Sequence, residues 1–195
     1  AFEVEGLVPY DLADMVLTHR IVSTNTEGSA VLASLTPTDR LGQHLSQLNE
    51  AGADPKSCVI DGDLLSVYSD ERTTAILDIG HSRTIVTVAT GGKTCFSRGI
   101  SFGGWHLTKA LSDHTNISFS EAQERKHQAR LSTTAAAEWE EDEPTNAGDI
   151  PPVRTHDDGA ILRSALGPLV ASIRTTLIGF EEDAKSEIDQ ILITG

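Results

Sequence analysis

The chain has 195 residues, of which 38% are hydrophobic and 23% are charged, a composition typical of a globular protein with a proper core. Its 15 Lys and Arg residues against 29 Asp and Glu residues give a formal net charge of −14. This charge argues against nucleic acid or an anionic membrane surface as a direct partner. An acidic exterior fits either a basic protein partner or plain solubility.

The two cysteines, Cys58 and Cys95, lie far apart in predicted strands, so we expect two reduced core thiols rather than a disulfide. The seven histidines show no metal-ligand spacing with cysteine or acidic residues, and no metal site is expected. No run of 18 apolar residues and no signal peptide are present, so the sequence predicts no transmembrane helix.

The N-terminal part predicts a small α/β unit with the order strand, strand, helix, strand, helix over residues 12–70. Its β-rich stretches cover residues 15–23, 30–35 and 58–61, and a short second helix is expected over residues 63–69.

The first of these helices has clear end signals. Thr36 suits the N-cap position, Pro37 suits the first helical turn, and Gly52 can end the helix in the left-handed conformation. Leucines between these positions form one apolar stripe, as expected for a helix that packs on a sheet.

Residues 75–104 carry the most informative pattern. Three runs rich in Val, Ile and Thr are separated by turns at Asp78-Ile79-Gly80 and Gly91-Gly92, and the third run stops at Gly103-Gly104. This punctuation predicts an antiparallel meander of three strands.

The first turn of this meander presents an acid, a glycine and two hydroxyls at residues 78–84. Backbone N–H groups in such a turn can cradle a phosphate, and Asp78 can hold Mg²⁺ directly or through water. An ordinary hairpin whose Asp and Ser cap the turn is the alternative interpretation. His81 and Ser82 are adjacent and point apart, so they do not form a nucleophile–base pair.

The C-terminal half predicts helices, one acidic loop and a last strand. Ser118 and Glu121 have capping-box spacing, and Gly167-Pro168 is expected to kink the last helix or delay its start. The expected helices cover residues 105–113, 120–131 and 160–180, the acidic loop covers 132–159, and the strand covers 190–194. The apolar strand before Gly195 is typical of a piece of a longer protein.

The segment from Asp78-Ile79-Gly80 to Gly103-Gly104 resembles the second phosphate segment of the actin-like ATPase superfamily, and most of all the PilM and GspL families. In those families it leads to an E-x-x-x-x-K element, and here Glu121 and Lys126 have that spacing. The resemblance implies an α/β, actin-like (ribonuclease H-like) fragment. Residues 1–70 would be the small inserted α/β subdomain, and residues 71–195 the actin-like subdomain.

The resemblance also implies a cofactor-binding set. An actin-like nucleotide site needs two D-x-G hairpins and a Gly-Gly turn, and this chain supplies one hairpin. We therefore expect no catalytic residues, no enzyme activity and no cofactor in this fragment, and Mg-ATP is an option only for the full-length protein. The implied cofactor-binding residues are Asp78, Gly80, His81, Ser82, Thr84, Gly103, Gly104, Glu121 and Lys126.

Two classes of function follow from this resemblance. The first is a cytoplasmic scaffold of a secretion or pilus platform, at the cytoplasmic face of the bacterial inner membrane. The second is a nucleotide-dependent kinase or ATPase. The N-terminal residues are closer to the GspL type, which makes type II secretion the leading interpretation and type IV pilus assembly the alternative.

The expected partners differ between these interpretations. GspL implies the N-terminal domain of the motor ATPase GspE, whereas PilM implies the cytoplasmic tail of PilN in a groove beside the inserted subdomain. Other inner-membrane platform subunits and a homodimer are further options, and no nucleic acid is expected.

Overall fold

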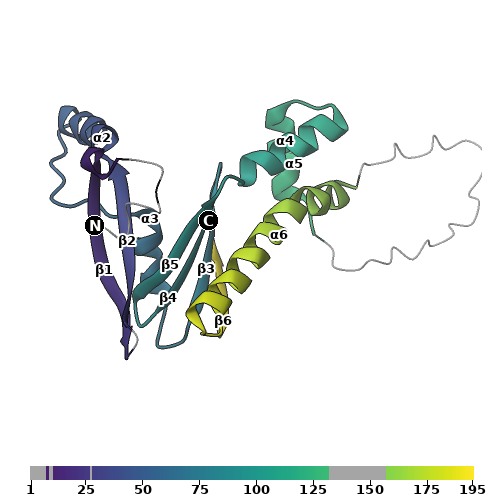
Figure 1. Ribbon diagram of the computed structural model, residues 1–195. Coiled ribbons are helices and arrows are strands. Elements are labelled where there is room, and N and C mark those ends of the chain that lie inside the picture. Colours follow the sequence, from purple (N-terminus) through teal and green to yellow (C-terminus); the bar gives the residue numbers. More distant parts are fainter. Residues whose placement is uncertain (1–7, 9–10, 27, 132–156) are drawn as a thin grey trace, which may run out of the picture.

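The computed structural model describes residues 8, 11–26, 28–131 and 157–195. Most of the N-terminal residues that were compared with the GspL type, and most of the predicted acidic loop, fall on residues 1–7, 9–10 and 132–156, outside this part. The described residues form one two-stranded and one four-stranded sheet, with helices around them (Figure 1).

The four-stranded sheet has the order β5-β4-β3-β6. β3 (Thr74–Ile79), β4 (Thr84–Thr90) and β5 (Lys93–Ile100) form the predicted antiparallel meander. β6 (Gln190–Thr194) pairs with β3 in parallel, and its Ile191, Leu192 and Ile193 are 52%, 36% and 70% exposed. β6 therefore forms an edge with apolar side chains on both faces.

Helices cover both faces of this sheet. α6 (Asp158–Ala184) crosses one face (Figure 1), where Phe180 packs with Ala75 and Val88. On the other face lie the short helices α3 (Asp61–Leu64) and η2 (Leu65–Tyr68). Thr87 reaches α3 on that face because successive side chains of a strand point to opposite sides.

α6 is continuous through Pro168 and begins earlier than expected, at Asp158. By length and composition α6 could cross a membrane. The sequence predicted no such helix because it contains no run of 18 apolar residues. Leu162, Leu169 and Phe180 are buried along it. In this structure α6 contacts α4 and packs on the sheet through Phe180.

α4 (Gly104–Thr115) and α5 (Phe119–Gln128) follow β5 and agree with the two predicted helices to within a few residues. Ser118 caps α5, since its Oγ accepts the N–H of Glu121 at 3.2 Å. An ion pair between Arg125 and Asp158 ties α5 to the start of α6, with Arg125 Nε 2.9 Å from Asp158 Oδ2.

The two-stranded sheet lies to the left in Figure 1 and carries α2 at one end. It consists of β1 (Met15–Asn25) and β2 (Gly28–Pro37), preceded by η1 (Leu12–Asp14) and followed by α2 (Thr38–Glu50). The left-handed end of α2 is confirmed, since Gly52 has φ +82°. The predicted N-cap is wrong, because Thr36 stays in β2 and Pro37 takes that position.

The strand predicted over residues 58–61 is also wrong. Val59 and Ile60 are 59% and 44% exposed, and Asp61 begins α3. A short β-branched run forms a strand only where a neighbouring strand is available for pairing, and this segment has none among the described residues. Cys58 is exposed rather than in the core, and both it and Cys95 are free thiols.

Two isoleucines of the main sheet give a matched test of this fold. Ile76 in β3 is fully buried and Ile193 in β6 is exposed. Ile76→Ala should lower the free energy of unfolding by about 2–5 kcal/mol, because it removes buried apolar surface and leaves a cavity. Ile193→Ala should cost far less, and urea denaturation of both variants measures the difference. Equal losses would contradict the burial described here.

Candidate functional site

The hairpin loop at residues 80–83 joins β3 to β4. The Gly80 N–H donates to the Arg83 carbonyl at 3.0 Å and closes the turn. Asp78 is half-buried at the end of β3, where it pairs with β4 on one side and β6 on the other. His81 and Ser82 are exposed at the tip, so a ligand can reach them.

Thr84 takes a different place from the other loop residues. It is fully buried, and its hydroxyl donates to the Phe102 carbonyl at 2.8 Å. Its hydroxyl therefore joins β4 to the segment after β5.

Gly103 and Gly104 hold the hairpin loop against the start of α4. The Gly104 N–H donates to the Gly80 carbonyl at 2.9 Å, and the Trp105 N–H donates to the His81 carbonyl at 2.7 Å. A Cβ on Gly103 would overlap the Gly80 carbonyl and lie 2.6 Å from the His81 oxygen. Only a glycine allows these two backbones to approach so closely.

Lys126 reaches the same place from α5. Its Nζ donates to the Gly104 carbonyl at 3.2 Å and to Gln123 Oε1 at 3.0 Å, and burial lowers the pKa of the Lys126 ammonium. Glu121 lies exposed in the first turn of α5. No ion pair between Glu121 and Lys126 occurs in the described part of the chain, in agreement with their i,i+5 spacing.

The end of β6 completes this region. A Cβ on Gly195 would overlap the backbone of Ile79, so β6 ends directly beside the hairpin loop. The structure thus gathers the acid, the loop, the Gly-Gly pair and the lysine of the predicted set, and leaves Glu121 on the outer side. A turn backbone with a carboxylate and a hydroxyl near it is the kind of arrangement that can hold a phosphate and its metal ion.

The segment Asp61-Gly62-Asp63, which we call the DGD connector, was not assigned to the site from the sequence, because it has the wrong spacing for a D-x-G hairpin. Asp61 forms an ion pair with Arg83 of the hairpin loop. Asp63 forms another with Arg20 of β1, whose Nη2 lies 2.7 Å from Asp63 Oδ1. The connector thus joins the loop to the two-stranded sheet.

The middle residue of the DGD connector is fixed on the main sheet. The Gly62 carbonyl accepts the hydroxyls of Thr87 at 3.1 Å and Thr94 at 3.4 Å. A Cβ on Gly62 would overlap Ser97 Oγ. Arg20 adds a bond from Nη2 to the Thr94 carbonyl at 2.9 Å.

A groove runs between the two-stranded sheet and the main sheet. It is a cavity of about 250 Å³, and two neighbouring cavities of about 570 and 160 Å³ on the side of the two-stranded sheet share Ser34 and Asp63 with it. We call this the inter-sheet groove. Its walls include Leu32, Ala33 and Ser34 of β2, Ser97 and Gly99 of β5, and Ile60, Asp61, Asp63 and Arg83 between them.

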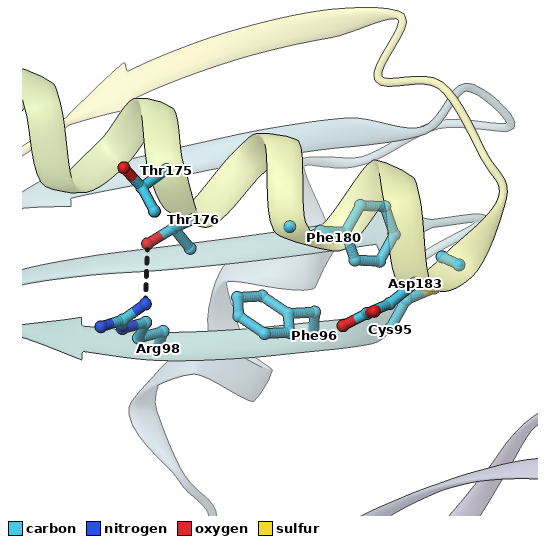
Figure 2. Close-up of a pocket in the computed structure, with 9 residues that line it drawn as sticks. Cys95, Phe96, Arg98, Thr175, Thr176, Phe180 and Asp183 are labelled. Carbon is cyan, nitrogen blue, oxygen red and sulfur yellow. Dashed lines mark hydrogen bonds between the residues drawn. The ribbon is translucent and has the colours of Figure 1, made fainter.

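Another cavity, of about 360 Å³, lies between β5 and α6 (Figure 2). The rings of Phe96 and Phe180 face each other there with centroids 5.9 Å apart, and Arg98 Nη1 donates to Thr176 Oγ1 at 3.3 Å. No group of three metal-ligating side chains occurs among the described residues. These contacts join β5 to α6 and do not indicate chemistry.

A family model described as cell division protein FtsA matches residues 75–177, more than half of the chain. The chain belongs to the FtsA family. The matched residues of this FtsA-family chain begin in β3 and run into α6, so they include the hairpin loop, the Gly-Gly pair and Lys126. The predicted actin-like superfamily is confirmed.

Two solved structures are similar to this FtsA-family chain. One is a PilM–PilN type IV pilus biogenesis complex, with a TM-score of 0.69, 19% identity, and coverage of 100% of this chain and 53% of that one. The other is the ethanolamine utilization protein EutJ from Carboxydothermus hydrogenoformans, with a TM-score of 0.50, 15% identity, and coverage of 76% and 46%.

At these identities the two structures show the fold alone, and they confirm the predicted actin-like α/β class. The chain spans about half the length of the chains it matches. A comparison with curated protein sequences gives no match.

Gly103→Ala tests the contact between the hairpin loop and α4. The added Cβ should push the loop away and lower the free energy of unfolding by about 1–3 kcal/mol, as overpacking does. Gly99→Ala in β5 is the matched control, since a Cβ there meets nothing within 4 Å. Urea denaturation measures both, and NMR shifts of residues 80–84 should change only in Gly103→Ala.

Lys126 should titrate below the ordinary pKa of a lysine side chain, because burial favours its neutral form. Its folded-state pKa then lies below the unfolded value, so the unfolded state binds more protons between the two values. The free energy of unfolding should therefore rise with pH across that interval. The ¹³Cε shift of Lys126 measures the titration, and a midpoint at the ordinary pKa of a lysine side chain would contradict it.

Proposed function

We propose that this chain is the partner-binding part of a PilM-like protein of type IV pilus assembly, and that the inter-sheet groove holds an extended tail of a PilN-like partner. The observation that carries the proposal is this groove, in a chain whose whole length matches the PilM–PilN complex. An identity of 19% leaves the partner of this chain as a proposal.

The walls of the groove suit an extended peptide. β5 is an edge of the main sheet and β2 belongs to a sheet of two strands, so in the part of the chain that the structure describes each has one side without a strand partner. Free strand edges bind extended segments through main-chain hydrogen bonds, while pockets select side chains. Leu32 and Ile60 offer apolar contacts, and Ser34 and Asp63 offer polar ones.

The match to a pilus complex favours this function over the type II secretion interpretation. The GspL interpretation with GspE as partner remains the rival within the platform class. The family model and EutJ carry cell division and ethanolamine utilization in their descriptions, because one fold hosts several functions. Binding of this chain to a PilN-like tail or to GspE distinguishes the pilus interpretation from the secretion interpretation.

We propose that this chain contributes only one part of a nucleotide-binding site. Asp78, Ser82 and the loop backbone would hold one phosphate and its Mg²⁺, and the metal would offset the phosphate charge when Mg-ATP is bound. Because this chain supplies one of the three expected segments, we propose that alone it is not an enzyme and binds Mg-ATP weakly. Isothermal titration measures this, and micromolar affinity would contradict it.

The proposed location is the cytoplasmic face of the inner membrane, where the tail of a PilN-like protein would hold the chain. Other platform subunits and a second copy of the chain are further partners within this proposal. The net charge of −14 would favour basic partner surfaces.

Fluorescence anisotropy with a labelled tail peptide from the PilN-like protein of the same genome tests the proposed function. Ser34→Arg should fill the inter-sheet groove and weaken binding about tenfold or more, which corresponds to roughly 1.4 kcal/mol. Thr175→Arg makes a similar change in the cavity of Figure 2 and should leave the affinity within about twofold.

Circular dichroism should show that both variants are folded. Absence of binding by the unmodified chain, or equal losses in both variants, would contradict the groove as the binding site. Capture of the GspE N-terminal domain without the tail peptide would favour the secretion interpretation instead.

A further inference from the structure

Arg83 is part of both the hairpin loop and the wall of the inter-sheet groove. Its backbone closes the hairpin loop, where its carbonyl accepts the Gly80 N–H. Its guanidinium pairs with Asp61, and both side chains line the inter-sheet groove. The candidate phosphate loop and the candidate peptide groove therefore share one residue.

The position of Asp61 does not depend on this ion pair. Asp61 Oδ1 accepts the Gly62 N–H at 2.9 Å, and Gly62 is held on the main sheet by Thr87. The Asp61 carboxylate therefore stays in the groove wall whether or not Arg83 is paired with it. What changes is the charge that the groove presents.

The ion pair is weak enough to open. The Arg83 side chain is 64% exposed and the Asp61 side chain is 44% exposed. Exposed pairs of this kind contribute roughly 0–1 kcal/mol, whereas a guanidinium binds a phosphate through two parallel hydrogen bonds. An anion at the tip of the hairpin loop would therefore compete with Asp61 for Arg83.

We propose that Arg83 is a coupling residue: a phosphate group bound at the hairpin loop draws Arg83 away from Asp61, and the uncompensated Asp61 then strengthens the binding of a basic tail in the inter-sheet groove. This inference rests on the proposed function, because it assumes that the groove binds a tail. The direction is set by charge, since an acidic or neutral tail gains nothing from a free carboxylate.

The affinity of the tail peptide is measured with and without inorganic tripolyphosphate at constant ionic strength. Tripolyphosphate carries no nucleoside, so its effect does not depend on an adenosine-binding segment, and the Arg83→Gln variant corrects for its direct binding to the basic peptide. The anion should raise the affinity for the basic tail up to about fivefold, which corresponds to the roughly 1 kcal/mol of an exposed ion pair. A tail peptide with its Lys and Arg residues replaced by Gln should show no change.

Variants separate the parts of this coupling. Arg83→Gln should bind the basic tail more tightly without anion and lose the response to tripolyphosphate. Asp61→Asn and the double variant should also lose the response, without the gain in affinity. Lys109→Gln breaks a similarly exposed ion pair, with Asp113 in α4, and is the matched control that should behave as the unmodified chain.

Two results would overturn the coupling. One is an Arg83→Gln variant whose affinity for the basic tail is unchanged. The other is an Arg83 side-chain NMR signal that does not move when tripolyphosphate is added. If neither tail peptide binds the unmodified chain, the proposed function fails, and the movement of the Arg83 signal still decides whether the ion pair exchanges.

Discussion

The structure depends on the close backbone contact between the hairpin loop and the start of α4. Two hydrogen bonds, from Gly104 and Trp105 to the carbonyls of Gly80 and His81, fix the loop before any ligand arrives. Gly103 makes this approach sterically feasible. A loop held in this way loses little conformational entropy when it binds a phosphate, which is the advantage of preorganisation.

The sequence predicted the elements that local residues determine. The meander over residues 75–104 was predicted correctly because β-branched runs and glycine turns specify it without help from distant segments. Ser118 and Gly52 likewise mark helix ends through their own backbone chemistry. The apolar run at residues 58–60 led to a wrong strand prediction. A strand also needs a pairing partner, and the local sequence does not indicate whether one is present.

For the candidate site, the sequence analysis predicted residues at the tip of the hairpin loop and did not predict the contacts that connect the loop to the rest of the fold. Arg83 and Asp61 are 22 positions apart in the chain, and charged residues at such a separation give no pattern until the fold brings them together. Gly62 is informative only beside Ser97. The family resemblance predicted the residues at the tip of the hairpin loop. The contacts of the DGD connector became evident only from the three-dimensional structure.

β6 has a practical consequence for the purified chain. No strand among the described residues pairs with its outer side, and Ile191 and Ile193 are exposed on one face of it. Open, apolar edge strands are templates for adding a foreign strand, and proteins avoid them with charges or prolines, neither of which this strand contains. At high protein concentration we therefore expect molecules of this chain to associate through the β6 edge. The substitution Ile193→Lys should reduce this association.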